Sequence, residues 1–236
     1  TEAPIDEEDA FRNSGRLVFN PYSIDDMQAM YKQDPKFTAD IVVNISVKDD
    51  NTIANSKVKL RDDGEGDLKI WAVPNCLQVE NRYLVSVDIG GKSTTSDYTV
   101  MTVIDRFGMI PTVKGKPKVV ARYRGHVRHD KLAWMAAALA HYYDDALLVI
   151  ESNTADREKN NNTEGDHFLT ILQEIADYYD NLYQRTSSSE NVEDNVLAKY
   201  GFQTNKLTKQ QVIDNLEEFI DDNLYEEPDK EMYHEL

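Results

Sequence analysis

Two acidic residues stand where two apolar segments end. Asp88 lies near the end of segment 83–89, just before a pair of glycines, and Glu151 directly follows segment 146–150. In open α/β sheets, ligands collect at the carboxyl ends of strands, near points where the strand order changes. If the two segments form adjacent parallel strands, both carboxylates project into one crevice. The alternative is that each acid only ends its strand at the surface.

Crowded carboxylates predict a metal site. Two carboxylates about 4 Å apart repel each other by roughly 4 kcal/mol at an effective dielectric constant of about 20. A divalent cation between them removes this repulsion, and without a cation the two groups should raise each other's pKa. Oxygen ligands with no Cys or His nearby favour Mg²⁺ or Mn²⁺ over Zn²⁺. Asp88 and Glu151 are therefore candidate ligands of Mg²⁺ or Mn²⁺.

The elements that must position these acids follow from the hydrophobic pattern. Strands are predicted at 41–47, 57–60, 68–71, 83–89, 98–104 and 118–123. Apolar residues at helical spacing predict a helix over 130–143, capped by Asp130. The continuous apolar segment 146–150 is typical of a central strand buried on both faces. A hairpin series, a crossover helix and a buried strand predict a mixed α/β sheet with helices on its faces.

Further helices are predicted on either side of this unit. A short helix near 24–31 lies within segment 1–37, which is otherwise polar and rich in turns and is interpreted as a linker. Residues 38–236 then form the main domain. Helical spacing also predicts a helix at 168–179 and another from Thr208, where Thr208 and Gln211 form a capping box.

The composition limits the function classes. The 236 residues contain 40% hydrophobic residues, enough for a core, and no apolar run of about 18 residues that could cross a membrane. The single cysteine, Cys76, excludes an internal disulfide and fits a reducing cytosol. A net charge of −17 argues against a nucleic-acid binder. However, residues 1–10 contain five acids and residues 211–236 contain ten, so the central 200 residues carry only about −3.

Several segments, taken in chain order, resemble one known family. They are Val-Asp-Ile-Gly-Gly at 87–91 and the segments at 96–100, 119–126, 132–133 and 146–153, followed by 199–204 and a lysine-containing helix from Thr208. Segments 7–11 and 15–19 precede them. From about residue 7 to the end, this ordered set resembles the nuclease domain of phage terminase large subunits, although no single segment is specific. Segment 1–37 resembles the linker that follows the family's ATPase part.

The resemblance implies a ribonuclease-H-like fold, two divalent metal ions and cutting of double-stranded DNA at the start and end of packaging. Asp88 would bridge the two ions, and Glu151 would be the second acid. Asp97 stands where the family often has a further acid, as an auxiliary ligand or as a plain turn residue. The implied partners are the ATPase domain of the same chain, the terminase small subunit and the portal. The implied location is the cytoplasm of a bacterial host, for a phage or prophage protein.

The sequence departs from the family in two ways. The phosphate-binding loop of the ATPase part is absent. The family's third acid lies in a His-Asp-Asp-like segment near the C-terminus, and we expect its counterpart beyond Leu236. The nearest acids are interpreted as a solvated helix face: Asp214, Glu217, Asp221 and Asp222.

Five basic residues are candidate contacts for DNA phosphates: Arg122, Arg124, Arg128, Lys206 and Lys209. The alternative for each is an ordinary solvated surface base. Two rival functions stay open. An actin-like or sugar-kinase-like phosphotransferase would need a second Asp-x-Gly turn and a glycine-rich adenosine segment, and neither is visible. A non-catalytic packaging scaffold would keep the fold without the site, and the presence of both Asp88 and Glu151 argues against it.

Overall fold

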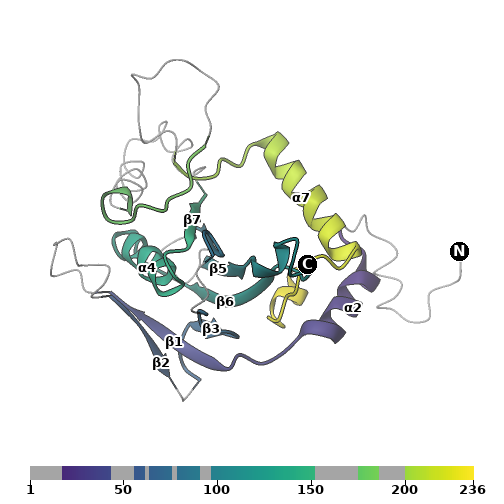
Figure 1. Cartoon of the computed structure of the whole chain (residues 1–236), viewed down its shortest axis with the longest axis horizontal. Coiled ribbons are helices and arrows are strands. Elements are labelled where there is room, and N and C mark those ends of the chain that lie inside the picture. The colour runs from purple at the N-terminus through teal and green to yellow at the C-terminus, as the bar shows by residue number, and fades with distance from the viewer. Residues whose placement is uncertain are drawn as a thin grey trace, which may run out of the picture.

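The computed structural model describes residues 18–43, 56–61, 64–75, 79–90, 97–151, 175–185 and 200–236. At its centre is a seven-stranded sheet with the strand order β2-β1-β3-β6-β5-β4-β7 (Figure 1). The strands are β1 (Phe37–Val42), β2 (Lys57–Arg61), β3 (Leu68–Ile70), β4 (Tyr83–Asp88), β5 (Thr99–Asp105), β6 (Lys118–Gly125) and β7 (Leu147–Ile150). Each neighbouring pair is antiparallel except β4 and β7, which run parallel.

The chain connects these strands as the hydrophobic pattern predicts. Strands β4, β5 and β6 follow one another as antiparallel neighbours, and helix α4 (His129–Tyr142) then leads the chain to β7 beside β4. A parallel neighbour requires such a crossover, since a tight turn can join only antiparallel strands. In the order β6-β5-β4-β7, strand β4 lies between its antiparallel neighbour β5 and its parallel neighbour β7. The predicted mixed α/β fold with helices on the sheet is confirmed.

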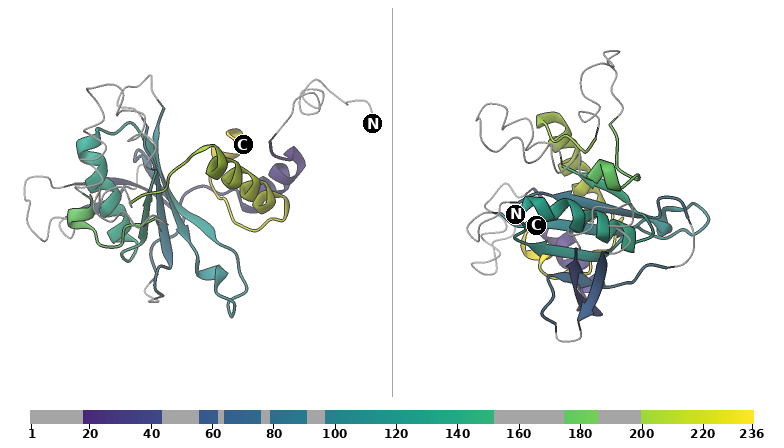
Figure 2. Two further views of the ribbon diagram at one scale, coloured as in Figure 1. Left: turned by 90° about the horizontal axis from the view of Figure 1, so that it is seen from above. Right: turned by 90° about the vertical axis from the view of Figure 1, so that its left-hand side faces the viewer.

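The two faces of the sheet have different coverings, as Figure 2 shows. Alternate residues of β4 and β5, such as Val85 and Met101, are buried in a large core that includes α4 and Leu148 of β7. Burial of one such side chain stabilises the fold by about 1.5–3 kcal/mol, which fixes the strand register. Because side chains alternate along a strand, Asp88 is directed to the face opposite α4.

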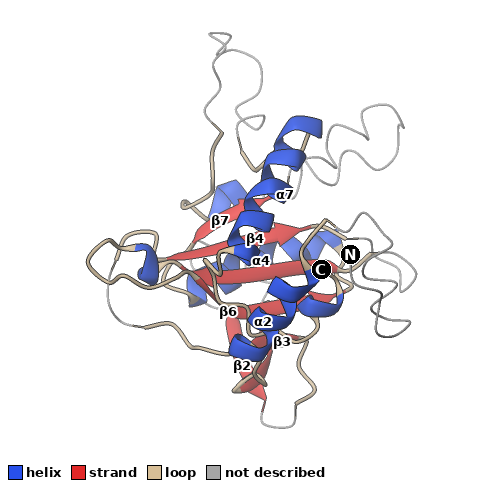
Figure 3. Cartoon of the chain, turned by 90° about the vertical axis from the view of Figure 1, so that its right-hand side faces the viewer, coloured by secondary structure: helices blue, strands red, loops and turns tan. Residues whose placement is uncertain are grey.

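That opposite face is covered by elements from both ends of the chain (Figure 3). Helices α2 (Pro21–Tyr31) and α7 (Lys206–Asp221) meet there, and Met27, Ile220 and Tyr233 form a second hydrophobic cluster. Residues 222–236, here called the C-terminal segment, include the 3₁₀ turn η3 (Met232–His234). Glu226 N–H donates to the Pro117 carbonyl and Val119 N–H to the Glu226 carbonyl, both at 3.0 Å. These bonds hold the C-terminal segment against the start of β6.

Some predicted boundaries are wrong. The first strand covers Phe37–Val42 and not 41–47, and residues 44–47 lie outside the described part. Helix α4 has Arg128 as its N-cap, so Asp130 lies within the first turn and does not cap it. Helix α7 begins before Thr208. Its cap is Asn205, which accepts the Thr208 N–H while the Thr208 hydroxyl accepts the Asn205 N–H. Two orphan backbone donors are thereby satisfied at the earlier position.

The sequence predicts a central strand at 146–150, and this prediction is wrong. Strand β7 is the last strand of the described sheet. Its outer edge is nevertheless covered, because Leu148 N–H donates to the Asn181 carbonyl at 2.9 Å and Tyr183 N–H donates to the Leu148 carbonyl at 2.8 Å. The segment around 181–184 therefore stands in for a further strand. This pairing covers the outer edge of β7, whose side chains alternate between half-buried and buried positions.

Other predictions fall largely outside the described residues. The predicted helix at 168–179 is described only from 175, and residues 175–178 are helical. Cys76 is outside the described part. The short N-terminal helix is present as α2, somewhat longer than predicted. Among the described helices, none is long and apolar enough to cross a membrane.

Candidate functional site

The carboxyl ends of β4 and β7 bring Asp88 and Glu151 together. Val87 lies opposite Ile150 in the parallel pair, and Glu151 N–H donates to the Val87 carbonyl at 3.1 Å. The two acids are therefore at the same level on adjacent strands. Both belong to the set of alternate residues that faces away from α4. The prediction that these strands are adjacent and parallel is confirmed.

The pKa of Asp88 reflects the closeness of the two acids. Although the residue is exposed as a whole, partial removal of its carboxyl group from water raises its pKa, and so do a hydrogen bond to Glu151 and the negative charge of Glu151. Asp97 contributes in the same direction, and the pKa of Asp88 reaches about 6. Two carboxyl groups in this arrangement hold a proton between them more tightly than either would alone.

Gly90 sets the distance between Asp97 and this pair. A Cβ atom at Gly90 would overlap the backbone of Asp97 and Tyr98, so only glycine allows the end of β4 to pass so close to the start of β5. The Gly90 N–H also donates to the Thr99 hydroxyl at 3.1 Å. Asp97 itself is exposed, yet its charge reaches Asp88. The Asp-x-Gly sequence thus serves the geometry of the carboxylate cluster.

The donor set suits a hard divalent cation. Mg²⁺ in proteins is commonly bound through one or two carboxylates, with waters and substrate phosphates completing the octahedron. Asp88 and Glu151 supply two such carboxylates, and Asp97 lies within electrostatic reach. Within the part of the chain that the structure describes, no group of three or more Asp, Glu, His or Cys side chains is close enough to hold a metal ion. Any ion here would therefore be held by a pair of carboxylates and would keep several waters.

Arg122 has a different role from the predicted one. It is buried on β6, and its guanidinium donates to Glu227 at 2.8 and 3.1 Å and to Asp229 at 3.2 Å. Burial acts to lower the pKa of Arg122, but the two carboxylates outweigh it and the pKa is raised. This corrects the prediction that Arg122 is available to DNA phosphates, because its donors are already engaged inside the protein. It anchors the C-terminal segment to the sheet.

Arg124 lies nearer to the acids. Asp88 is opposite Val100 on β5, and Val100 is opposite Arg124 on β6, so the three form one row across the sheet. The Arg124 guanidinium lies over the Tyr98 ring, 3.9 Å from its centroid, and donates to Glu235 at 3.2 Å. The side chain is exposed, and the predicted contact with phosphate stays a prediction.

The other three basic candidates are exposed: Arg128, Lys206 and Lys209. Arg128 caps α4, and the two lysines lie in the first turn of α7. Phe202, four residues before α7, bonds to the end of β7 through its N–H to the Ile150 carbonyl at 2.7 Å. The start of α7 therefore leaves the sheet beside Glu151.

Residues of the C-terminal segment were missed by the sequence analysis. A cavity of about 250 Å³ next to Asp88 is lined by Arg124 and by residues of this segment. The latter are Asp229, Glu231, Met232 and Glu235. By contrast, the four acids assigned to a solvated face of α7 are exposed as predicted: Asp214, Glu217, Asp221 and Asp222. One signal in the sequence could have pointed to the C-terminal segment, since Met232 and Tyr233 interrupt its acidic run with apolar side chains.

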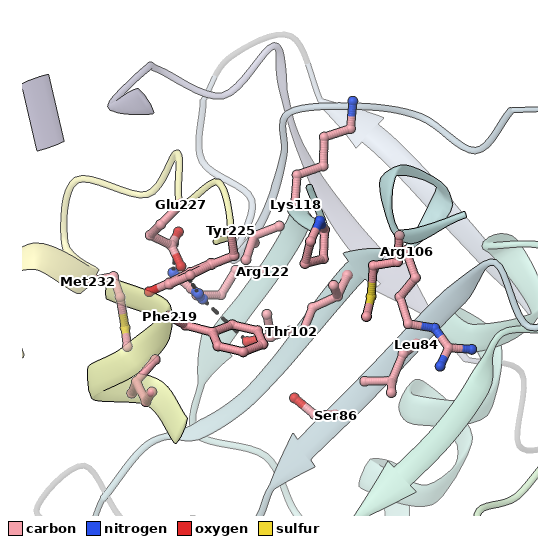
Figure 4. A pocket seen from close by; sticks show the side chains of 15 residues that line it. Leu84, Ser86, Thr102, Arg106, Lys118, Arg122, Phe219, Tyr225, Glu227 and Met232 are labelled. Atoms are coloured by element: carbon pink, nitrogen blue, oxygen red, sulfur yellow. Dashed lines mark hydrogen bonds and ion pairs between the residues drawn. The ribbon is translucent and has the colours of Figure 1, made fainter. Parts of the chain in front are cut away.

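A second cavity, of about 350 Å³, continues along the same face between the sheet and α7 (Figure 4). Its walls are largely apolar, with Leu84 on β4 and with Phe219, Tyr225 and Met232 from α7 and the C-terminal segment. Figure 4 shows the ion pair between Arg122 and Glu227 at its inner end. The face that carries Asp88 is thus hollowed along its length.

The similarity of this chain to known proteins lies in its structure. No protein-family model matches the chain, and no curated protein matches its sequence. The large terminase nuclease of the thermophilic phage G20c with bound zinc has a TM-score of 0.46 at 15% identity, over 72% of this chain and 75% of that one. The terminase nuclease domains of Thermus phage P74-26 and human cytomegalovirus each have a TM-score of 0.39, at 18% and 9% identity. They cover 71% and 63% of this chain, and 65% and 64% of their own chains. The fold is similar to that of large terminase nuclease domains.

Proposed function

We propose that this chain is the metal-dependent nuclease domain of a DNA-packaging terminase large subunit and hydrolyses phosphodiester bonds of double-stranded DNA. One observation carries the proposal: Asp88 and Glu151 meet at the carboxyl ends of two parallel strands, with the pKa of Asp88 raised to about 6. The ordered resemblance of the flanking segments to the terminase family supports the same conclusion.

Asp88 and Glu151 would hold two Mg²⁺ or Mn²⁺ ions, with Asp97 as an auxiliary group. When bound, the ions would supply the positive charge that readies an attacking water and stabilises the leaving oxygen. The resemblance to the terminase family implies that Asp88 would be the ligand shared by the ions, and both Glu151 and Asp97 act on its pKa. Below a pH of about 6, Asp88 carries a proton that a cation must displace.

The proposal implies several partners. They are double-stranded DNA, the ATPase domain of a longer chain, the terminase small subunit and the portal, in the cytoplasm of a bacterial host. Segment 1–37 would be the connection to the ATPase domain, and residues 38–236 the nuclease domain.

The test is nicking of supercoiled plasmid DNA. With only two carboxylates in direct contact, we expect weak nicking that is indifferent to sequence and stronger with Mn²⁺ than with Mg²⁺, which demands near-ideal octahedral geometry. Asp88→Ala and Glu151→Ala should each abolish nicking, and Asp97→Ala should reduce it. Glu217→Gln, on the exposed face of α7, is the matched control and should leave nicking unchanged.

Two results would overturn the proposal. One is plasmid that stays intact with Mn²⁺ at any enzyme concentration at which the protein is folded, which would favour a non-catalytic scaffold. The other is nicking that survives Asp88→Ala, which would place the activity elsewhere. Binding of ATP by the protein, together with intact plasmid, would favour a phosphotransferase.

A further inference from the structure

Three basic side chains lie on the same face of the sheet as Asp88, and each is bound by acids of the C-terminal segment. Lys69 on β3 is opposite Arg122 on β6, and Arg124 is two residues further along β6. Arg122 contacts Glu227 and Asp229, whereas Lys69 contacts Asp229 at 3.2 Å and Glu231 at 2.8 Å. Arg124 contacts Glu235 at 3.2 Å.

These ion pairs fall into an inner and an outer group. The inner acids Glu227 and Asp229 are almost completely buried, at 1% and 3% exposure. The outer side chains Glu231 and Glu235 are 50% and 56% exposed. Buried, multiply bonded pairs are difficult to open, whereas exposed pairs are screened by solvent and readily exchange partners. The inner ion pairs therefore anchor the C-terminal segment to the sheet. An incoming anion can replace the outer carboxylates of Glu231 and Glu235 on their basic partners.

The outer ion pairs lie beside the candidate site, where the backbone of a bound DNA strand would pass. Asp88, Val100 and Arg124 form one row across three neighbouring strands. Since neighbouring strands are about 4.8 Å apart, the backbones of Asp88 and Arg124 are about 10 Å apart. Asp88, Arg124, Glu231 and Glu235 also line the same cavity of about 250 Å³. An anion that replaced the Glu235 carboxylate on Arg124 would thus lie beside the carboxylate pair.

Arg124 is held ready for such an exchange. Its guanidinium lies 3.9 Å from the centroid of the Tyr98 ring, and Tyr98 in turn stacks on His126 at 4.3 Å. This stack does not involve Glu235. It would keep the guanidinium in place after Glu235 leaves, so little side-chain freedom would be lost when a phosphate binds.

We propose that Arg124 and Lys69 form a binding site for the phosphate backbone of a nucleic acid, and that Glu231 and Glu235 occupy this site as intramolecular competitors. The proposal deepens the proposed nuclease function and rests on it for the identity of the polyanion. The C-terminal segment would then reduce binding until phosphates displace its outer acids. Arg124 should contribute more than Lys69, because Lys69 retains Asp229 when Glu231 leaves.

The test measures binding of a short labelled DNA duplex by fluorescence anisotropy, with a chelator present so that no cutting occurs. Glu235→Gln should tighten binding by about two- to fivefold, the range that corresponds to losing one exposed ion pair. Glu231→Gln should have a smaller effect. Glu217→Gln makes the same charge change on α7 and controls for overall charge. The gain should vanish at high salt.

A second variant separates competition from a general structural effect. In the Glu235→Gln background, Arg124→Gln should abolish the gain, because the freed guanidinium is what the DNA binds. Thermal unfolding of each variant checks that the fold is kept. The proposal is overturned if Glu235→Gln binds no more tightly than Glu217→Gln, or if its gain persists with Arg124→Gln.

This result is independent of nicking. If the binding gain is found and depends on Arg124 but plasmid stays intact with Mn²⁺, the nuclease proposal fails and the phosphate site stands. If nicking occurs but Glu235→Gln behaves as the control does, the nuclease proposal stands and the competition proposal fails.

Discussion

Two arginines on β6, two residues apart, show how burial decides what a charged side chain contributes. The side chain of Arg122 is 9% exposed and is bound by two carboxylates, whereas that of Arg124 is 39% exposed and is bound by one. In sequence the two are indistinguishable, since both occupy alternate positions of one strand. What separates them is the C-terminal segment, more than 100 residues away, and no local pattern reports that contact.

Removal of Arg122 should destabilise the protein strongly. Arg122→Ala leaves the buried Glu227 carboxylate without this cationic partner and leaves Asp229 with Lys69, and breaking a buried pair in this way costs about 3–5 kcal/mol. Arg124→Ala removes an exposed ion pair with Glu235 and the contact with the Tyr98 ring, and should cost about 1–2 kcal/mol. Urea denaturation of both variants measures the difference. Similar free energies of unfolding for the two variants would contradict the role of Arg122 as an anchor.

At the scale of elements, the chain from β4 to β7 is well predicted by its sequence, and the outer elements are not. Residues of β4 and β5 alternate strictly between buried and half-buried positions, so the period of two is clear. The predicted adjacency of Asp88 and Glu151 follows from that clarity together with the crossover helix. Strand β1 was misplaced because its burial does not alternate. Strand β7 was predicted to be a central strand because segment 146–150 is continuously apolar, although alternate side chains of β7 are only half-buried. The C-terminal segment was missed because an acidic run is usually solvated.

Gly90, just after the end of β4, lies close to the backbone at the start of β5. Gly90→Ala introduces a Cβ atom that would overlap the backbone of Asp97 and Tyr98, so the start of β5 must move away. We expect a loss of about 1–3 kcal/mol in the free energy of unfolding, as for other overpacked positions. Plasmid nicking should also fall, because Asp97 moves away from Asp88.

Gly64→Ala is the comparison for this variant. Gly64 has a φ of 77°, but no atom lies within 4 Å of the added Cβ, so only backbone strain of about 1–2 kcal/mol is expected. Its nicking rate should equal that of the wild type. Equal loss of nicking in the two variants would show that the close approach at Gly90 does not serve the site.

For the whole molecule, the net charge of −17 is not spread evenly over the surface. Several acids near the C-terminus neutralise bases of the sheet. A second group of acids, Glu151 and Asp97, lies near Asp88 and raises its pKa. The second group should make stability depend on pH. A folded-state pKa of about 6, above the ordinary value of 3.8 for an aspartate, means that the folded state binds the proton more tightly. Stability from this group is therefore full at low pH and lost as the pH rises through about 6.

Asp88→Asn tests both this pH dependence and the stabilisation of the site by a cation. Without metal, the variant should be more stable than the wild type at pH 7, by at most about 1 kcal/mol because Asp88 is exposed to solvent. At pH 4 the difference should disappear. With millimolar Mn²⁺ the order should reverse, since the wild type binds the cation and is stabilised by it. Thermal unfolding at the two pH values records all of these changes, and a wild-type Tm that Mn²⁺ leaves unchanged would count against a metal site.

The hydrophobic cluster of Met27, Ile220 and Tyr233 has a mechanical consequence. Tyr233 is the middle one of the three residues between Glu231 and Glu235, so this cluster joins α2 to the turn that carries both acids. The sheet is stiffened by its own ladder of hydrogen bonds, whereas the side chains of Glu231 and Glu235 contact the sheet through exposed ion pairs. A displacement of α2 would therefore deform the turn around Tyr233 before it deformed the sheet. Displacement of α2 would thus shift Glu231 and Glu235 relative to Lys69 and Arg124, in the cavity next to Asp88.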